Sequence, residues 1–187
     1  MSEMIMTIVV ADTSGSMREH GKLALIRNLI GHLREREQHA RGDASAAGLV
    51  IVRWSTDAEV VVAPPEEDLP SWPAEGQTSV APLIALLDSL CTGDAHARLL
   101  LLSDGHCTSA DVSALKAWRR RCPRVSVRAL AIGPDAAAAT LGKITGPNGV
   151  FAAEEIIAAL TSWGVTEKPP LPDHLAALAQ RPELGAP

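Results

Sequence analysis

The sequence predicts an α/β fold in which a mostly parallel sheet is covered by helices on both faces. Short apolar runs rich in β-branched residues alternate along the chain with longer segments whose apolar residues have helical spacing. Apolar runs without polar alternation are typical of strands that are buried on both faces of a sheet. Because strands that alternate with helices connect in parallel, this order predicts a doubly wound fold of three layers.

In the first half of the chain, strands are expected at 5–11 and 49–54 from runs of apolar and β-branched residues. Between them, apolar residues at 26, 29, 30 and 33 share one face of a helix that runs from about 22 to 40. Turn residues at 55–57 precede a segment at 59–62, which we expect to return as an antiparallel strand at the sheet edge. Residues 63–77 hold four prolines and three consecutive acids, which predict a surface loop.

The second half of the chain continues the alternation. A helix begins near Pro82 with leucines at 83, 86, 87 and 90, and the apolar run at 98–103 is the next buried strand. A helix at 109–121 has an acid near its start and three arginines at its end, as the helix dipole favours. A strand at 125–132, a helix at 135–141, a strand at 150–151 and a helix at 154–163 complete a domain that we place at 1–164. The proline-rich residues 165–187 are expected to form a flexible or loosely docked tail.

Composition and charge exclude several classes of protein. The 187 residues suffice for one domain with its own core. The net charge is −5 and the chain has one Phe, four Trp and no Tyr, so a nucleic-acid partner is not expected. Apolar runs stay well below the roughly 18 residues of a membrane span, so no membrane contact is expected. Three cysteines without paired spacing, and a start without signal-peptide features, predict a cytoplasmic protein.

Oxygen-bearing side chains follow the predicted strands at the edge where ligands bind in doubly wound sheets. Asp12, Ser14 and Ser16 come directly after the first strand, and their alternate spacing aims them to one side of an extended loop. Thr78 opens the helix after the proline-rich loop, and Asp104 follows the strand at 98–103. Two carboxylates and three hydroxyls are hard oxygen donors, which suit Mg²⁺, Mn²⁺ or Ca²⁺ and suit zinc poorly.

These five residues resemble the metal-ion-dependent adhesion site of the von Willebrand factor A domain family. All positions of that motif are present, and the resemblance covers roughly residues 4–163. It implies the Rossmann-like fold of the family, with one antiparallel edge strand, and a divalent cation for which Mg²⁺ is the first expectation and Mn²⁺ or Ca²⁺ the alternatives. The implied direct ligands are Ser14, Ser16 and Thr78, with Asp12 and Asp104 binding directly or through water.

The resemblance predicts a protein-binding adaptor and not an enzyme. A carboxylate from an Asp or Glu of a partner would fill the coordination position that the five side chains leave open. Small intracellular bacterial members of the family, similar to tellurium-resistance-associated proteins or partnered with MoxR-type AAA+ ATPases, act as adaptors in stress-response or defence complexes. Candidate partners are therefore a AAA+ ATPase, a kinase or a phosphatase. The candidate contacts in the surrounding loops are Met17, Arg18, His20, Trp72 and His106, although Trp72 could equally pack beneath its own loop.

Other interpretations of these residues stay open. Asp12 could be a phosphoryl-accepting nucleophile, as in haloacid-dehalogenase-like phosphatases, although Ser14 stands where a second Asp is usual. The chain could also be a scaffold that binds partners without a metal. The segment from Gly15 to Lys22 does not match a phosphate-binding loop, because its glycines are too far apart and Leu23 replaces the required hydroxyl.

The predicted site also has a consequence for stability. Asp12 and Asp104 would be two carboxylates at close range, and these repel one another when no cation lies between them. We therefore expect Asp104→Ala to weaken metal and partner binding, to leave the fold intact, and to raise the stability of the metal-free protein slightly.

Overall fold

Six strands form one sheet in the computed structural model, which describes residues 5–40, 48–62, 67–91, 96–146 and 148–164. The strands are β1 (Met6–Asp12), β2 (Leu49–Trp54), β3 (Ala58–Val61), β4 (Ala97–Ser103), β5 (Val125–Ala131) and β6 (Val150–Ala152). Their order in the sheet is β3-β2-β1-β4-β5-β6. All neighbours are parallel except β2 and β3, which pair antiparallel at the edge. The predicted sheet is thus confirmed.

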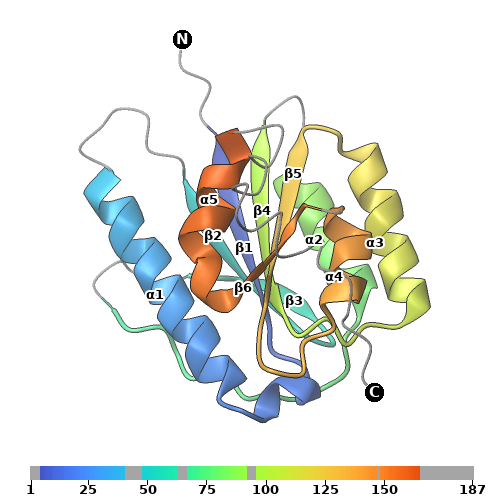
Figure 1. Ribbon diagram of the computed structural model, residues 1–187, viewed down its shortest axis with the longest axis horizontal. Helices are drawn as coiled ribbons and strands as arrows, with labels where there is room; N and C mark the ends of the chain where they lie inside the picture. The colour runs from blue at the N-terminus through green and yellow to red at the C-terminus, as the bar shows by residue number, and fades with distance from the viewer. Residues whose placement is uncertain (1–4, 41–47, 63–66, 92–95, 147, 165–187) are drawn as a thin grey trace, which may run out of the picture.

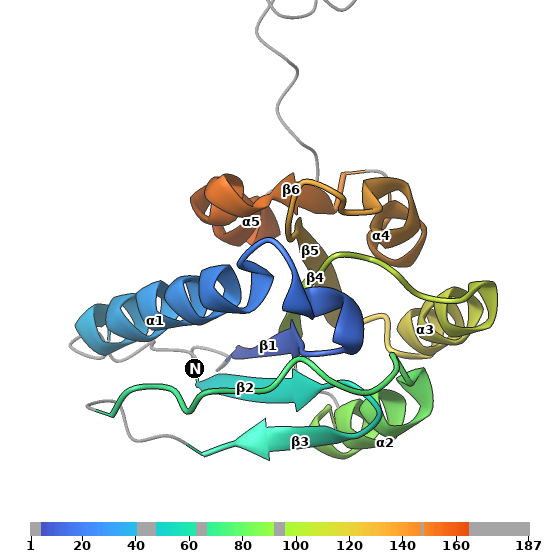
Figure 2. The same cartoon turned by 90° about the horizontal axis from the view of Figure 1, so that it is seen from below.

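Helices cover both faces of this sheet (Figures 1 and 2). One layer holds α1 (Lys22–Ala40) and α5 (Ile156–Thr161), and the other holds α2 (Val80–Leu90), α3 (Ser109–Arg121) and α4 (Ala138–Thr145). Within β1, Ile8 and Val10 join the core on the α2 and α3 side, whereas Val9 and Ala11 join the core on the α1 side. Because both faces of β1 are buried, its sequence is a continuous apolar run.

The boundaries of most predicted elements are confirmed, and one helix is displaced. The helix expected at 135–141 begins at Ala138 and continues to Thr145. Asp135 lies in a turn after β5 instead, where its carboxylate accepts a hydrogen bond from Lys22. Gly146, whose φ is 96°, follows the last turn of α4, a position that favours glycine. The predicted tail at 165–187 lies outside the described residues.

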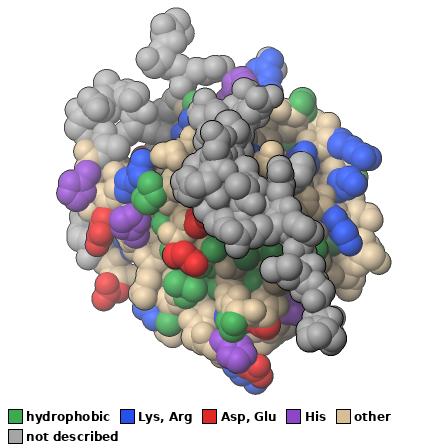
Figure 3. All heavy atoms as spheres, viewed as in Figure 1, with side chains coloured by type: hydrophobic (Ala, Val, Ile, Leu, Met, Phe, Trp, Pro, Cys, Tyr) green, Lys and Arg blue, Asp and Glu red, His purple; other side chains and the backbone are tan. Residues whose placement is uncertain are grey.

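Basic side chains gather on the side of the molecule where α3 lies (Figure 3). This helix ends in Arg119, Arg120 and Arg121. Arg119 reaches the neighbouring helix, where its Nη1 donates to the carbonyl oxygen of Ile144 at 2.6 Å, in the last turn of α4. Arg121 Nη2 lies 3.7 Å from a carboxylate oxygen of Asp88. Contacts within the fold therefore account for much of this basic run, together with the dipole of α3.

The two central strands bring the candidate site together. After β1 the chain crosses one face of the sheet through α1 to reach β2, and the connection from β3 to β4 crosses the other face through α2. The strand order therefore reverses between β1 and β4, and loops that leave such a point form the ligand-binding crevice of doubly wound folds. In Figure 1 these loops lie at the lower edge of the sheet.

Candidate metal-binding site

Backbone hydrogen bonds hold the loop after β1 against the loop that precedes α2. The Gly15 amide donates to the carbonyl oxygen of Gly76 at 3.0 Å, and the Glu75 amide donates to the carbonyl oxygen of Thr13 at 3.1 Å. Gly15 permits this approach, because a Cβ there would lie only 3.2 Å from the Gly76 oxygen. Thr78 is thereby brought to the serines of the first loop, although it is far from them in the sequence.

The three predicted hydroxyl ligands line one pocket. A hollow of about 260 Å³ is lined by Ser14, Ser16 and Thr78, together with Gly15, Gly76, Gln77, His106, Thr108 and Asp111. The Oγ atoms of Ser14 and Ser16 lie 3.2 Å apart. The hydroxyl groups of the predicted site therefore converge on a space that solvent and ligands can enter.

Both predicted carboxylates are buried and held by protein donors. Asp12 is 1% exposed, and its two oxygens accept hydrogen bonds from the Ser14 amide at 2.9 Å and from Ser103 Oγ at 2.6 Å. Asp104 is 0% exposed, and Oδ1 accepts a hydrogen bond from the His106 amide at 3.1 Å. Its Oδ2 accepts one from Lys22 Nζ at 2.9 Å. Ser103 was not among the predicted residues, although it directly precedes Asp104.

Burial raises the pKa of Asp12 above its ordinary value, because desolvation disfavours the charged carboxylate. Hydrogen bonds from Ser103 and Ser14 act in the opposite direction, and the negative charge of Asp104 adds slightly to the rise. A divalent cation nearby would favour the ionised form of Asp12. The electrostatics of this pair therefore suit a cation.

Lys22 is the main feature that the sequence did not lead us to expect. It was interpreted only as the start of a helix and as a poor match to a phosphate-binding loop. Its side chain is buried, and Nζ donates to Asp104 Oδ2, to Asp135 Oδ2 at 2.7 Å and to the Ser16 carbonyl oxygen at 3.1 Å. Burial lowers the pKa of Lys22, but the hydrogen bonds to Asp135 and Asp104 outweigh it, so the pKa lies above its ordinary value.

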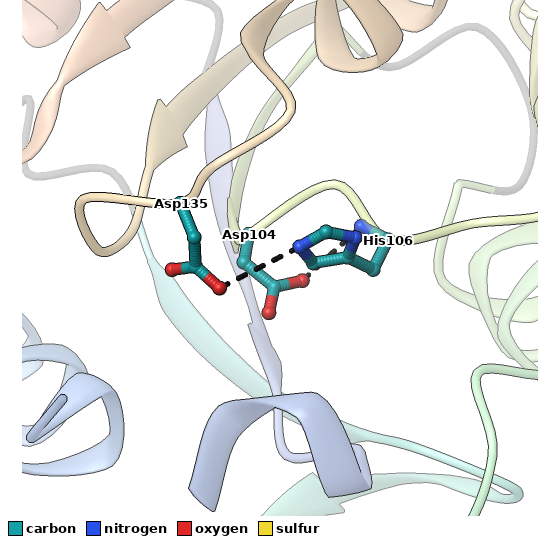
Figure 4. Close-up of side chains that lie close together, drawn as sticks. All are labelled: Asp104, His106 and Asp135. Carbon is teal, nitrogen blue, oxygen red and sulfur yellow. Dashed lines mark hydrogen bonds and ion pairs between the residues drawn. The ribbon is translucent and has the colours of Figure 1, made fainter. Parts of the chain in front are cut away.

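A second group of possible ligands adjoins the predicted five. Asp104, His106 and Asp135 point toward one another from the ends of β4 and β5 (Figure 4). One ligand atom from each lies within 4.8 Å of the others, and His106 Nε2 is 3.6 Å from Asp135 Oδ2. The hydrogen bond from Lys22 lowers the pKa of Asp135 below its ordinary value. Asp104 therefore belongs to both groups of candidate ligands.

The predicted partner contacts divide into exposed and buried residues. Arg18, His20 and His106 are exposed, and His106 lines the pocket. Met17 is 0% exposed and Trp72 is 8% exposed, and both pack in the core on the α1 side of the sheet. The prediction that Met17 and Trp72 contact a partner is therefore wrong. Both side chains are apolar, and their burial in the core is more favourable than exposure to water. Trp72 follows the other interpretation and packs beneath its loop.

Comparison with known proteins gives structural but not sequence matches. No protein-family model and no curated protein sequence matches the chain. Proximal thread matrix protein 1 from the mussel byssus, in a structure with a zinc-occupied MIDAS motif, has a TM-score of 0.61 and 15% identity over 86% of this chain and 47% of that one. Manganese-loaded TRAP from Plasmodium vivax has a TM-score of 0.62 and 14% identity, over 85% and 72% of the two chains.

A third similar structure is the ArnB paralog VWA2 from Sulfolobus acidocaldarius, with a TM-score of 0.60 and 19% identity over 86% of this chain and 45% of that one. The chain thus spans about half the length of the mussel and Sulfolobus proteins. Together with the antiparallel edge strand and the two helical layers, these likenesses define a domain with the von Willebrand factor A fold. In the described part of the chain, no helix has the length and apolarity needed to cross a bilayer.

Proposed function

We propose that this chain is a protein-binding module that holds a divalent cation, Mg²⁺ in the first place, at the carboxyl edge of its sheet. The observation that carries the proposal is the convergence of three hydroxyls from two loops on one pocket, next to two buried carboxylates. Hydroxyl and carboxylate oxygens are the donors that hard cations take. The residues that would hold the ion are Ser14, Ser16 and Thr78 directly, with Asp12 and Asp104 binding directly or through water. Two structures of the same fold are described as zinc-occupied and manganese-loaded.

The bound ion would supply a Lewis-acid position for a carboxylate of a partner protein. Exposed Arg18, His20 and His106 stand in the neighbouring loops as candidate contacts for that partner. We place the module in the cytoplasm of a bacterium, as an adaptor in a stress-response or defence complex with a AAA+ ATPase, a kinase or a phosphatase. This context is supported by the family resemblance alone. The net charge of −5 supports a protein partner over a nucleic acid.

A phosphotransfer reaction at Asp12 finds no support in the site. A phosphoryl-accepting carboxylate needs an oxygen that can reach the phosphorus atom. Asp12 is buried, and each of its oxygens already accepts a hydrogen bond. We therefore propose a binding role without catalysis. Hydrolysis of a generic phosphate ester with Mg²⁺, abolished in Asp12→Asn, would contradict it.

The metal site is tested by titrating the protein with Mg²⁺ and Mn²⁺ in a calorimeter. We expect the wild type to bind one ion per chain at the predicted site, and Ser14→Ala/Ser16→Ala to bind it at least about tenfold more weakly. The control is Ser89→Ala/Ser113→Ala, which removes two exposed helix hydroxyls and should bind the ion like the wild type. A wild type that binds neither ion would refute the proposed site.

The dependence of partner binding on the metal needs a separate experiment. Affinity capture from the native cell is carried out in Mg²⁺ and in EDTA, with the wild type and with Ser14→Ala/Ser16→Ala as baits. We expect a specific partner in Mg²⁺ with the wild-type bait alone. Capture of the same partner in EDTA, or by the double variant, would favour the metal-independent scaffold.

A further inference from the structure

The protein binds the Lys22 ammonium as it would bind a free cation. Each N–H of an ammonium can donate one hydrogen bond, and three oxygens accept here: Asp104 Oδ2 at 2.9 Å, Asp135 Oδ2 at 2.7 Å and the Ser16 carbonyl at 3.1 Å. The side chain is 1% exposed. Lys22 is therefore a desolvated cation that is enclosed by oxygen atoms, and two of these belong to carboxylates.

The loop after β5 is shaped to receive the stem of this lysine. Gly133 has a φ of 93°, which favours glycine. A Cβ at this position would lie 2.6 Å from Cε and 3.1 Å from Cγ of Lys22. Two residues further on, Asp135 supplies one of the carboxylate acceptors. One short loop thus makes room for the stem and also binds the charged end, so the position of Lys22 is built into the fold.

We propose that the Lys22 ammonium is a built-in cation that occupies a second cation position beside the metal site. Asp104, His106 and Asp135 provide this position, since one ligand atom from each lies within 4.8 Å of the others (Figure 4). Carboxylate and imidazole together are suitable ligands for Mn²⁺ or zinc. In this chain the two carboxylates bind an ammonium instead, and the imidazole of His106 lies at the side of Asp135.

Because the Lys22 ammonium occupies this position, the fold does not need a divalent ion there. A fully buried carboxylate without a counter-charge is strongly disfavoured, and Lys22 supplies that charge to Asp104 from within the chain. The ammonium also connects the start of α1, the loop that holds Ser16, the end of β4 and the loop after β5. The inference rests on the proposed function only in that Asp104 would be shared between Lys22 and the ion of the first site.

The first test measures thermal unfolding in EDTA. Lys22→Met keeps a long stem but removes the charge, so we expect Tm to fall by about 10 °C. Lys22→Met/Asp104→Asn also removes the buried carboxylate charge and should regain at least about half of that loss. The control is Lys116→Met on the exposed surface of α3, which should shift Tm by less than about 2 °C. An unchanged Tm in Lys22→Met, or a double variant no more stable than Lys22→Met, would overturn the proposal.

The second test counts bound Mn²⁺ from the electron paramagnetic resonance signal of the free ion. Lys22→Ala removes the ammonium and most of its stem, so this variant should bind one more Mn²⁺ per chain than the wild type. Lys22→Ala combined with His106→Ala should no longer bind the extra Mn²⁺, whereas Lys22→Ala combined with Ser14→Ala/Ser16→Ala should still bind it. No extra ion in Lys22→Ala, or its loss with the two serines, would contradict the built-in cation. A wild type without bound Mn²⁺ would contradict only the proposed metal site.

Discussion

We expect Asp104→Ala to lower the free energy of unfolding of the metal-free protein by about 3 kcal/mol. The carboxylate is fully buried, and it binds Lys22 at 2.9 Å and the amide of His106 at 3.1 Å. Removal of one partner from a buried ion pair costs about 3–5 kcal/mol, because the other charge is left without compensation. Here Lys22 keeps Asp135 and the Ser16 carbonyl as acceptors, which places the loss at the lower end of that range.

Relief of repulsion between Asp12 and Asp104 offsets only a small part of this loss. The charge of Asp104 is the smallest of the causes that shift the pKa of Asp12, and burial is the largest. The repulsion is therefore a minor influence on Asp12, whereas Asp104 and Lys22 are joined by a direct hydrogen bond of 2.9 Å. The sequence alone suggested that Asp104→Ala would slightly raise the stability of the metal-free protein. We now expect it to lower that stability, because the sequence did not show that Lys22 pairs with Asp104.

Urea unfolding in EDTA, followed by tryptophan fluorescence, measures this loss. Asp68→Ala, which removes an exposed aspartate from the loop before α2, is the matched control and should unfold like the wild type within about 0.5 kcal/mol. Thermal unfolding should give a Tm about 9 °C lower for Asp104→Ala, since about 1 kcal/mol corresponds to 2–4 °C in a domain of this size. A variant as stable as the wild type, or more stable, would refute the reasoning.

Four further predictions concern the surroundings of the site. Burial raises the pKa of Cys107 from 9.0 to about 12, so iodoacetamide at pH 8 should alkylate it on the order of a hundredfold more slowly in the folded than in the urea-unfolded chain. For the same reason stability should fall as the pH rises from about 9 towards 12, where the unfolded thiol ionises first, and Cys107→Ala should reduce that slope. Thr108→Ala removes the capping box with Asp111 at the start of α3 and should cost about 1 kcal/mol in urea unfolding, whereas Thr108→Ser should cost little. Gly133→Ala should lower the free energy of unfolding by about 2 kcal/mol, because φ is positive at this position and the new Cβ would meet the side chain of Lys22. The loss should be smaller when Lys22 is also changed to Ala, and an equal loss would contradict the contact with Lys22.

The order and type of the elements could be predicted because local patterns carry that information. The buried strands β1 and β4 are continuous apolar runs, and α1 shows the spacing of a helix with one buried face. The helix α4 was expected to begin at 135 but begins at Ala138, and Asp135 lies in the turn before it. Its carboxylate binds a lysine that is distant in the sequence, and no local pattern records such a contact.

The oxygen-bearing residues of the candidate site could be named for a related reason. In a parallel sheet, residues at the carboxyl ends of adjacent strands meet, so Asp12 and Asp104 were expected at one place. Thr78 was named because it opens the helix after the proline-rich loop, and its role as a direct ligand was implied by the family resemblance. Met17 and Trp72 were mistaken for surface contacts, because a loop segment near a site does not disclose which of its apolar side chains turn inward.

The sequence alone was enough to determine the sheet and its helical layers, because hydrophobic periodicity is a local property. It also determined the chemical nature of the donors, because their positions at the ends of strands can be located in the sequence. The pairing of Asp104 with Lys22, and the stem of Lys22 lying over Gly133, emerged solely from the folded arrangement. These features depend on how the start of α1 lies relative to the loops after β4 and β5, which are distant from it in the sequence. Whether a buried charge finds a partner is settled in three dimensions, because the strength of an ion pair depends on distance and burial and not on sequence spacing.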